Sequence, residues 1–500
     1  MNAHKTNNIM FLGTGSDVGK SILATAYCRI LKNQGYVVAP FKAQNMSNNS
    51  YVTIEGGEIG RAQAAQAEAA GVLPSVYMNP VLLKPTGEMG SQVIICGNVH
   101  KNMSAADYYR YKSIVKKQVL NSYQKLSDQY QWIVLEGAGS CCEVNLRQHD
   151  IVNFEMALQI NAPVIIVADI DRGGVFAQII GSMALISEQE KKLVAGFIIN
   201  KFRGNPKLFQ DGIRFIESHT GKPVLGLVPY YHHIHIDMED SMSLDASIKH
   251  SKNLIHIAVV RPDHISNFTD LEALASEPEV SINWLTKPDR LMEHDAVVIP
   301  GSKNVIYDIS QLYQRGWPDA LRAYLKKDRG FIIGLCGGYQ MLGHRISDPE
   351  GMEGIQKEVS GFGLLDIHTI IETTKIVKKS CGKERLFQSH VAGYEIHMGR
   401  TQSGNNVIPF IDFDTHKEGS ISNDGNVFGT YLHGLFDSGS FRKNLLYHIA
   451  KKNHIQLNSD IDHLDYWDLK EQNYERLAGH FQEYTQVNNI IQIAMNPLNN

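Results

Sequence analysis

The stretch FLGTGSDVGKSILATAYCRIL, Phe11–Leu31, decides the fold predicted for the first half of this chain. An apolar run that predicts a buried strand leads into a loop of small residues, and a helix pattern follows and ends before Gly35. This order of strand, loop and helix is the setting of a phosphate-binding loop, in which successive backbone N–H groups converge on phosphate oxygens. The spelling departs from the common G-x-x-x-x-G-K-[ST] pattern, because Thr14 stands where the first Gly belongs and Gly13 comes one residue earlier.

The loop nevertheless supplies the groups that phosphate binding requires. Lys20 is the cation expected on the β- and γ-phosphates, and Ser21 is the hydroxyl expected on Mg²⁺. Thr14 would bring a backbone N–H and a hydroxyl close to the γ-phosphate. A plain Gly-rich turn that caps a helix is the alternative, and Gly-Lys-Ser at the helix start argues against it. The predicted nucleotide-binding residues of the loop are Thr14, Gly15, Ser16, Asp17, Gly19, Lys20 and Ser21.

Short apolar runs bounded by turn residues recur along the chain, as expected of parallel strands buried on both faces with helices between them. Six such runs lie between Ile9 and Val228, and a second series, which includes a predicted strand at Gly363–Ile367, ends near residue 440. We therefore predict an α/β protein with two parallel-sheet, three-layer domains. The predicted boundaries are a nucleotide-binding domain at 1–232, a linker at 233–252, a second domain at 253–440, and a helical extension at 441–500 with an irregular tail from Gln486.

Composition and charge narrow the class of protein. The 500 residues are too many for one ordinary core, and the net charge of −4 gives no electrostatic case for binding nucleic acid or an anionic membrane. No apolar run approaches the ~18 residues that span a bilayer, and the first residues do not follow a signal-peptide pattern. The six cysteines show no C-x-x-C pair and no disulfide framework. We expect a cytoplasmic protein.

Two further polar residues stand at predicted strand ends in the first domain. Glu136 closes the strand Trp132–Leu135, where its carboxylate would ligate Mg²⁺ beside the phosphate loop. Asn200 closes the strand Phe197–Ile199, where its amide would read the adenine edge of a nucleotide. A simple turn residue is the alternative for Asn200.

The second domain contains a cysteine in an unusual setting, GFIIGLCGGYQMLG, residues 330–343. The glycines around Cys336 allow the sharp strand-to-helix elbow that exposes a nucleophile, and a helix N-terminus favours the thiolate. The backbone N–H of Gly337 would face an oxyanion that forms next to the sulfur. A lone cysteine is usually a small core residue, but this setting favours a nucleophile.

This elbow resembles that of class I glutamine amidotransferases, which implies a flavodoxin-like glutaminase domain. The segment IPGSKN, Ile299–Asn304, resembles the loop that gives that family its second oxyanion N–H, which places Ser302 in the oxyanion hole. GTYLHGLFD resembles the catalytic segment, so His433 is the predicted base, and His397 is predicted to be structural or close to the substrate. Most members have a Glu two residues after the His, where this chain has Leu435. What orients the His433 ring therefore stays open, with Glu395 and Asp437 as candidates.

The phosphate loop resembles that of dethiobiotin synthetase and of the cobyrinic-acid amidating enzymes, which form acyl phosphates. Partition-type ATPases have a similar loop but carry a second Lys where this chain has Gly15, which argues against that class. Segments from Phe11 to about Leu477, above all QNMSNN and DIDRGG, resemble the cobyric acid synthase family. The resemblance implies amidation of four peripheral carboxylates (b, d, e and g) of adenosylcobyrinic a,c-diamide in cobalamin biosynthesis, with ATP, Mg²⁺ and L-glutamine and without a tightly bound cofactor.

The corrinoid contacts are the least defined part of the prediction. Amide side chains that both donate and accept hydrogen bonds suit a substrate with carboxylates and amides, although a polar turn is the alternative. Two rival functions remain: an a,c-diamide synthase, and a nucleotide-driven scaffold whose glutaminase has decayed. Asp150, Asp169 and Asp171 lie near predicted strand ends or loops, where they would either bind Mg²⁺ or steer ammonium. The predicted substrate residues are Lys42, Gln44, Asn45, Asn48, Asn49, Asp150, Asp171 and Arg172.

Overall fold

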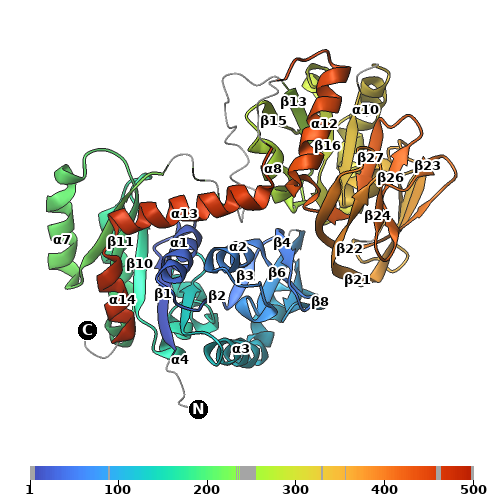
Figure 1. Cartoon of the computed structure of the whole chain (residues 1–500). Helices are drawn as coiled ribbons and strands as arrows, with labels where there is room; N and C mark the ends of the chain where they lie inside the picture. The colour runs from blue at the N-terminus through green and yellow to red at the C-terminus, as the bar shows by residue number, and fades with distance from the viewer. Residues whose placement is uncertain are drawn as a thin grey trace.

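The computed structural model describes residues 6–87, 90–231, 234, 236, 255–327, 330–354, 356–457 and 463–496. Two α/β bodies lie side by side, and a long helix near the C-terminus connects them (Figure 1). Of the predicted linker 233–252, only Ile234 and Ile236 belong to the described residues.

The first body is built on a six-stranded parallel sheet, as the apolar runs predict. All its strands are buried, and hydrophobic clusters cover both of its faces. Helices α1 (Lys20–Asn33) and α2 (Arg61–Ala70) lie on one side next to each other. The strand order is β12 (Val224–Pro229), β11 (Val194–Phe202), β10 (Val164–Asp169), β1 (Asn7–Gly13), β9 (Trp132–Glu136) and β2 (Val38–Phe41).

Between β2 and helix α3 (Ala105–Ser127) the chain adds small strands that the apolar pattern did not predict. These strands are short, or they combine short apolar runs with polar residues, Gly and Pro, so the strand signal is weak. One hairpin pairs β4 (Ser50–Val52) with β5 (Glu58–Gly60), and its first strand contacts the second body. A separate four-stranded sheet contains β3 (Gln44–Met46), β6 (Val81–Gly87), β7 (Gly90–Ile95) and β8 (Asn98–Ser104).

The second body has a sheet that is parallel over five strands and antiparallel at one edge. The order is β15 (Val280–Leu285), β13 (Ile255–Val260), β16 (Ala296–Ile299), β18 (Ile332–Leu335), β27 (Val427–Thr430), β26 (Ser420–Ser422) and β23 (Val407–Ile408). The two-domain α/β fold is thus confirmed.

The strand predicted at Gly363–Ile367 is wrong. Residues 363–366 form bends, and the backbone N–H groups of Leu364 and Leu365 bond to the carbonyl of Leu342 at the end of helix α11 (Gly337–Leu342). The apolar run is buried against this helix instead of entering the sheet. From Ile367 the chain forms the long antiparallel hairpin of β21 (Ile367–Glu384) and β22 (His390–Ser403).

Helices α12 (Gly439–Lys452), α13 (Tyr466–Tyr484) and α14 (Val487–Met495) complete the chain. Helix α13 runs from the second body onto the first (Figure 1), where Glu471 pairs with Arg29 at 2.8 Å. The irregular tail predicted from Gln486 is wrong, because α14 buries side chains at helical spacing, Val487, Ile490, Ile491 and Ala494. Among the described residues, no helix is long and apolar enough to span a membrane.

Candidate active site

The phosphate loop connects β1 to α1 and folds around its own lysine. The Nζ of Lys20 donates to the carbonyls of Gly15 and Gly139, each at 2.8 Å. A side chain at Gly13 would begin 2.9 Å from this Nζ and 2.8 Å from Val18 Cγ2. Gly19 has φ of 103°, a left-handed conformation that favours glycine. The displaced Gly13 is therefore required for the loop to close, and the unusual spelling corresponds to an intact loop.

Glu136 lies at the carboxyl end of β9, beside the start of α1. Its carboxylate accepts hydrogen bonds from Ser21 Oγ and Lys42 Nζ, both at 2.8 Å, and from Gln66 Nε2 at 2.6 Å. Burial opposes ionisation, but the ion pair with Lys42 and these hydrogen bonds hold the pKa of Glu136 below its usual value. An ionised carboxylate next to a hydroxyl is an oxygen donor pair that fits Mg²⁺, which takes few protein ligands when phosphates supply the others.

Asn200 and Thr14 hold the loop to the neighbouring strands. Asn200 Nδ2 donates to the carbonyl of Val18 at 2.9 Å, and its buried Oδ1 has no partner among the described residues. The backbone N–H of Thr14 donates to Val167 O at 3.0 Å, and its hydroxyl contacts Gln178 Oε1 at 3.1 Å. The expectation that this N–H faces the γ-phosphate is therefore wrong, since the N–H belongs to the contact with β10. Only the hydroxyl is left for that role.

The predicted substrate residues fall into two groups. One group lies around Glu136, in which Lys42 is buried in its ion pair and Asn45 Nδ2 donates to Gln63 Oε1 at 2.9 Å. Gln44 Oε1 accepts from the hydroxyl of Tyr108 at 2.6 Å. Asn48 and Asn49 follow in the same partly buried turn.

The other group is engaged elsewhere. Asp150 accepts three backbone N–H groups at 2.9–3.2 Å, from Val152, Asn153 and Glu155, and so caps helix α4 (Phe154–Ile160). Asp171 pairs with Arg203 at 2.6 Å, Arg172 approaches Asp17 to 3.6 Å, and Asp169 pairs with Lys201 at 2.9 Å. Asp17, Asp171 and Arg172 surround the outer edge of the loop, and their substrate roles stay predictions.

Cys336 stands at the carboxyl end of β18, directly before α11. Its φ of 50° and ψ of −108° describe a strained elbow. A side chain at Gly338 would begin 1.9 Å from Ile299 O, and one at Gly337 would begin 2.7 Å from Ser302 N. The elbow is therefore pressed against the loop that carries Ser302, which brings together the two predicted oxyanion positions.

His433 lies on strand β28 (Leu432–His433), and its ring is oriented by a residue that sequence reasoning missed. His433 Nδ1 is 2.7 Å from Asp270 Oδ2, and Asp270 Oδ1 accepts the N–H of Gly434 at 3.0 Å. Burial disfavours the imidazolium, but Asp270 and the neighbouring Cys336 overcome it and raise the pKa of His433 to about 10. Cys336, His433 and Asp270 form the nucleophile–base–carboxylate arrangement of a thiol hydrolase.

The two carboxylates proposed to orient His433 do other things. Glu395 binds Ser380 and lies 3.2 Å from Lys378 Nζ, while its strand neighbour Tyr394 is the residue that pairs with His433. Neighbouring residues of a strand point to opposite faces, so Glu395 is turned away. Asp437 ends the 3-10 helix that follows His433, Leu435–Asp437, and it lines a cleft between the two bodies. Asp270 lies in a short 3-10 helix, Phe268–Leu271. No sequence spacing connects this helix to His433, which lies far along the chain, so the sequence alone did not identify Asp270.

A cavity of about 60 Å³ lies next to Cys336 and is lined by side chains from both bodies. The first body contributes Lys84, and the second contributes Lys303 and Lys375 among others. His397 also lines the cavity, bonds the carbonyl of Gly399 through Nδ1 at 2.7 Å and stacks on Tyr431. The nucleophile therefore faces the junction of the two bodies.

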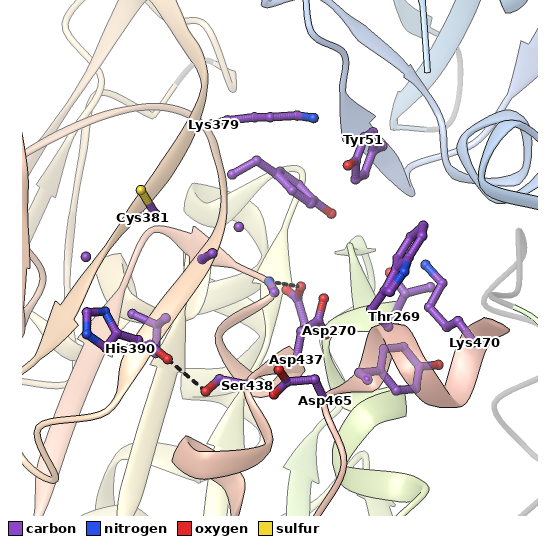
Figure 2. Close-up of a pocket in the computed structure, with 18 of the residues that line it drawn as sticks. Tyr51, Thr269, Asp270, Lys379, Cys381, His390, Asp437, Ser438, Asp465 and Lys470 are labelled. Atoms are coloured by element: carbon purple, nitrogen blue, oxygen red, sulfur yellow. Dashed lines mark hydrogen bonds between the residues drawn. The ribbon is translucent and has the colours of Figure 1, made fainter. Parts of the chain in front are cut away.

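A larger cleft of about 810 Å³ also lies between the bodies (Figure 2). Tyr51 of the first body, Lys379 of the β21 hairpin and Lys470 of α13 stand around it, and Asp270 and Asp437 line it as well (Figure 2). The cleft thus reaches the carboxylate that orients His433, whereas Cys336 lines the smaller cavity.

Comparison with known proteins matches a different family model to each half of the chain. Residues 9–244 match the CobQ/CobB/MinD/ParA nucleotide binding domain, and residues 256–441 match the CobB/CobQ-like glutamine amidotransferase domain. A cobyric acid synthase of Syntrophobacter fumaroxidans is 45% identical over 97% of this chain and 98% of its own length. That of Clostridium novyi is 44% identical over 95% of both chains. Among solved structures, a glutamine amidotransferase is 13% identical and covers 40% of this chain and 99% of its own, with a TM-score of 0.30.

Proposed function

The chain belongs to the cobyric acid synthase family, and from this premise we propose that it uses ATP and glutamine to amidate the b, d, e and g carboxylates of adenosylcobyrinic a,c-diamide. At the coarser level it is a glutamine-dependent amidating ligase of cobalamin biosynthesis, with a nucleotide-binding domain and a glutamine amidotransferase domain. The proposal adds the identity of the substrate, the number of carboxylates and an acyl-phosphate intermediate.

One observation carries the proposal. The phosphate loop with Ser21 and Glu136, and the elbow with Cys336, His433 and Asp270, occur in one chain whose two bodies are in contact. A phosphate loop alone fits many nucleotide enzymes, and a glutaminase alone only releases ammonia. Together they supply both an activated carboxylate and the nitrogen that replaces its phosphate.

In the glutaminase half, Cys336 attacks the side-chain amide carbon of glutamine, and His433 gives a proton to the departing ammonia. Asp270 positions the ring and stabilises its charged form. The N–H groups of Gly337 and Ser302 receive the oxyanion, which replaces hydrogen bonds to water by preorganised donors. Water then hydrolyses the thioester and releases glutamate.

In the ligase half, a substrate carboxylate attacks the γ-phosphate of ATP to form an acyl phosphate and ADP. Lys20 turns from its loop carbonyls to the β- and γ-phosphates, and ammonia then displaces inorganic phosphate to give the amide. Mg²⁺ bound by Ser21, Glu136 and the phosphates would neutralise phosphate charge. We assign these roles to residues 1–232 and the glutaminase to 253–440, joined by 233–252, with 441–500 as a helical extension across both.

The test is mass spectrometry of a corrinoid incubated with the enzyme, ATP, Mg²⁺ and glutamine. Each reaction replaces a carboxyl –OH by –NH₂, so the mass shift counts the amidations. We expect four amidations on adenosylcobyrinic a,c-diamide, and activity only on cobyrinic acid would show an a,c-diamide synthase instead.

Cys336→Ala should lose glutamine-dependent product and keep ammonium-dependent product. A variant that kept its glutamine hydrolysis would contradict the nucleophile, and a wild type without it would support the decayed scaffold.

A further inference from the structure

Three lysines lie beside the cysteine elbow, and the mechanism above does not use them; Lys84 is buried, and Lys303 and Lys375 are partly buried. Lys84 comes from β6 of the first body, Lys375 from β21 of the second, and Lys303 directly follows the oxyanion residue Ser302. All three line the cavity that contains Cys336. Lysine is rarely buried without a partner, so this concentration needs a counter-charge.

The carboxylates nearby compensate the lysines only in part. Glu58 lies between Lys84, at 2.5 Å, and Lys375. Burial opposes its ionisation, yet Lys375 and Lys84 hold the pKa of Glu58 well below its usual value, so it carries one negative charge. Glu353 is the acid among the described residues that line the cavity, and its pKa is raised to about 7, chiefly by burial.

The lysines therefore exceed the negative charge available to them. Burial is the main cause that lowers the pKa of Lys303 to about 7, and the proximity of Lys375 and Lys84 lowers it further, against the opposing effect of Glu58 and Glu353. An anion that enters the cavity would relieve this repulsion.

The three lysines also have more N–H donors than the hydrogen bonds that they make. An ammonium carries three N–H donors. Lys84 uses two, to Ser50 Oγ at 2.9 Å and to Glu58, and Lys303 uses one, to Gln92 Oε1 at 3.2 Å. Lys375 uses one, to Glu58. Within the described part of the chain no further acceptor takes the remaining donors.

We propose that Lys84, Lys303 and Lys375 bind the α-carboxylate of glutamine. This assignment rests on the proposed glutaminase, which fixes the other end of the same substrate at Cys336. A short aliphatic chain separates the two ends of glutamine. Because Cys336 and the three lysines line one cavity, a single glutamine would present its amide to the sulfur and its carboxylate to the lysines. The site is completed by Lys84 of the nucleotide-binding body, and glutamine is therefore recognised by both domains at their junction.

The experiment compares L-glutamine with L-glutaminamide, which has a neutral amide in place of the α-carboxylate. Steady-state hydrolysis of the side-chain amide is followed in the full chain by mass spectrometry of glutamate or isoglutamine. The wild type should prefer glutamine by about 10²-fold in kcat/KM, the scale of charge-assisted hydrogen bonds to a carboxylate. Equal turnover of both substrates would overturn the assignment, and no turnover of either would overturn the proposed function as well.

Two variants test whether the preference for glutamine over glutaminamide comes from these lysines. Lys303→Met, which leaves the Glu58 ion pairs intact, and Lys84→Met should each raise KM for glutamine by about tenfold or more, with a smaller change in kcat, because the carboxylate is remote from the reacting carbon. Both should hydrolyse glutaminamide at the wild-type rate, which also shows that they are folded. Lys383→Met, an exposed lysine of the same hairpin as Lys375, is the control. Equal losses on both substrates would mean that the lysines only hold the two bodies together.

Discussion

The phosphate loop and the cysteine elbow are both turns between a buried parallel strand and a helix, yet they are completed in different ways. The phosphate loop closes on itself, since Lys20 donates to the carbonyl of Gly15, and Ser21 donates to Glu136 of the adjacent strand β9. The elbow exposes one strained residue, Cys336, and takes its base from β28 and its carboxylate from a short helix before β15. The first site is therefore complete within one body, whereas the second depends on several segments and on the other body.

The largest effect should come from the self-contained site. Lys20→Ala removes the cation of the β- and γ-phosphates and should reduce amidation by about 10²–10³-fold, the scale of a lost transition-state donor. The loss should be the same with glutamine and with ammonium, because both need the acyl phosphate. The measurement is corrinoid amidation with each nitrogen source, and Lys32→Ala in the same helix is the control.

Glutamine hydrolysis by Lys20→Ala sharpens the comparison. If the two sites are separate, it should continue near the wild-type rate. Full ammonium-dependent synthesis by the variant would contradict the phosphate-loop assignment.

A smaller effect is expected at the distributed site. Asp270→Asn weakens the bond that orients His433, and glutamine hydrolysis should fall on the order of 10²-fold, within the range of general acid–base contributions. Ammonium-dependent amidation should not change. Asp437→Asn, which changes another acid of the same cleft, is the matched control (Figure 2). Equal losses in both variants would point to the charge of the cleft and not to the bond with the ring.

The pH profile of this variant separates positioning from a general loss of structure. The pKa of His433 is raised to about 10, so in the wild type the imidazolium is present below that pH and is lost as the pH rises through it. Without the Asp270 charge the pKa falls toward its ordinary value, and the alkaline limb of glutamine hydrolysis should move to lower pH. An unchanged limb would show that Asp270 does not set the charge of the ring.

The same difference explains what the sequence could predict. The residues of the loop, Gly13–Ser21, are contiguous, so their spacing alone identifies them, and Glu136 follows a recognisable buried strand. Asp270 and His433 are brought together only by the fold, and the 3-10 helix that holds Asp270 has no pattern of its own. Lys84 lies in a small sheet whose strands combine short apolar runs with polar residues, Gly and Pro, and this weak signal did not predict the sheet or its contact with the second body. The prediction of an irregular tail fails at helix α14 for a different reason, since the helical spacing from Val487 to Ala494 is present in the sequence but is short and lies next to polar residues at the end of the chain.

The smallest effect concerns Thr14, the residue that makes the loop unusual. Its hydroxyl is the only group of Thr14 left to approach a phosphoryl group, because its N–H is bound to Val167. Thr14→Gly restores the common spelling and should lower kcat of ammonium-dependent amidation about three- to tenfold, as expected from the loss of about 1 kcal/mol of hydrogen bonding. KM for ATP should stay close to the wild-type value, since the contact is made in the transition state.

Two companion variants decide whether the hydroxyl acts on the phosphate or only braces the loop. Thr14→Ser keeps the hydroxyl and should retain most of kcat. Gln178→Ala removes the side chain that accepts a hydrogen bond from the Thr14 hydroxyl at 3.1 Å in the structure. If this hydroxyl acts on the phosphate, losing Gln178 leaves it available, and kcat should stay near the wild-type value. If Gln178→Ala is as slow as Thr14→Gly, the hydroxyl serves to tie the loop to helix α5 (Val175–Leu185). The loop would then depend on a distant segment, as the elbow does, and the contrast between the two sites would be weaker than the geometry indicates.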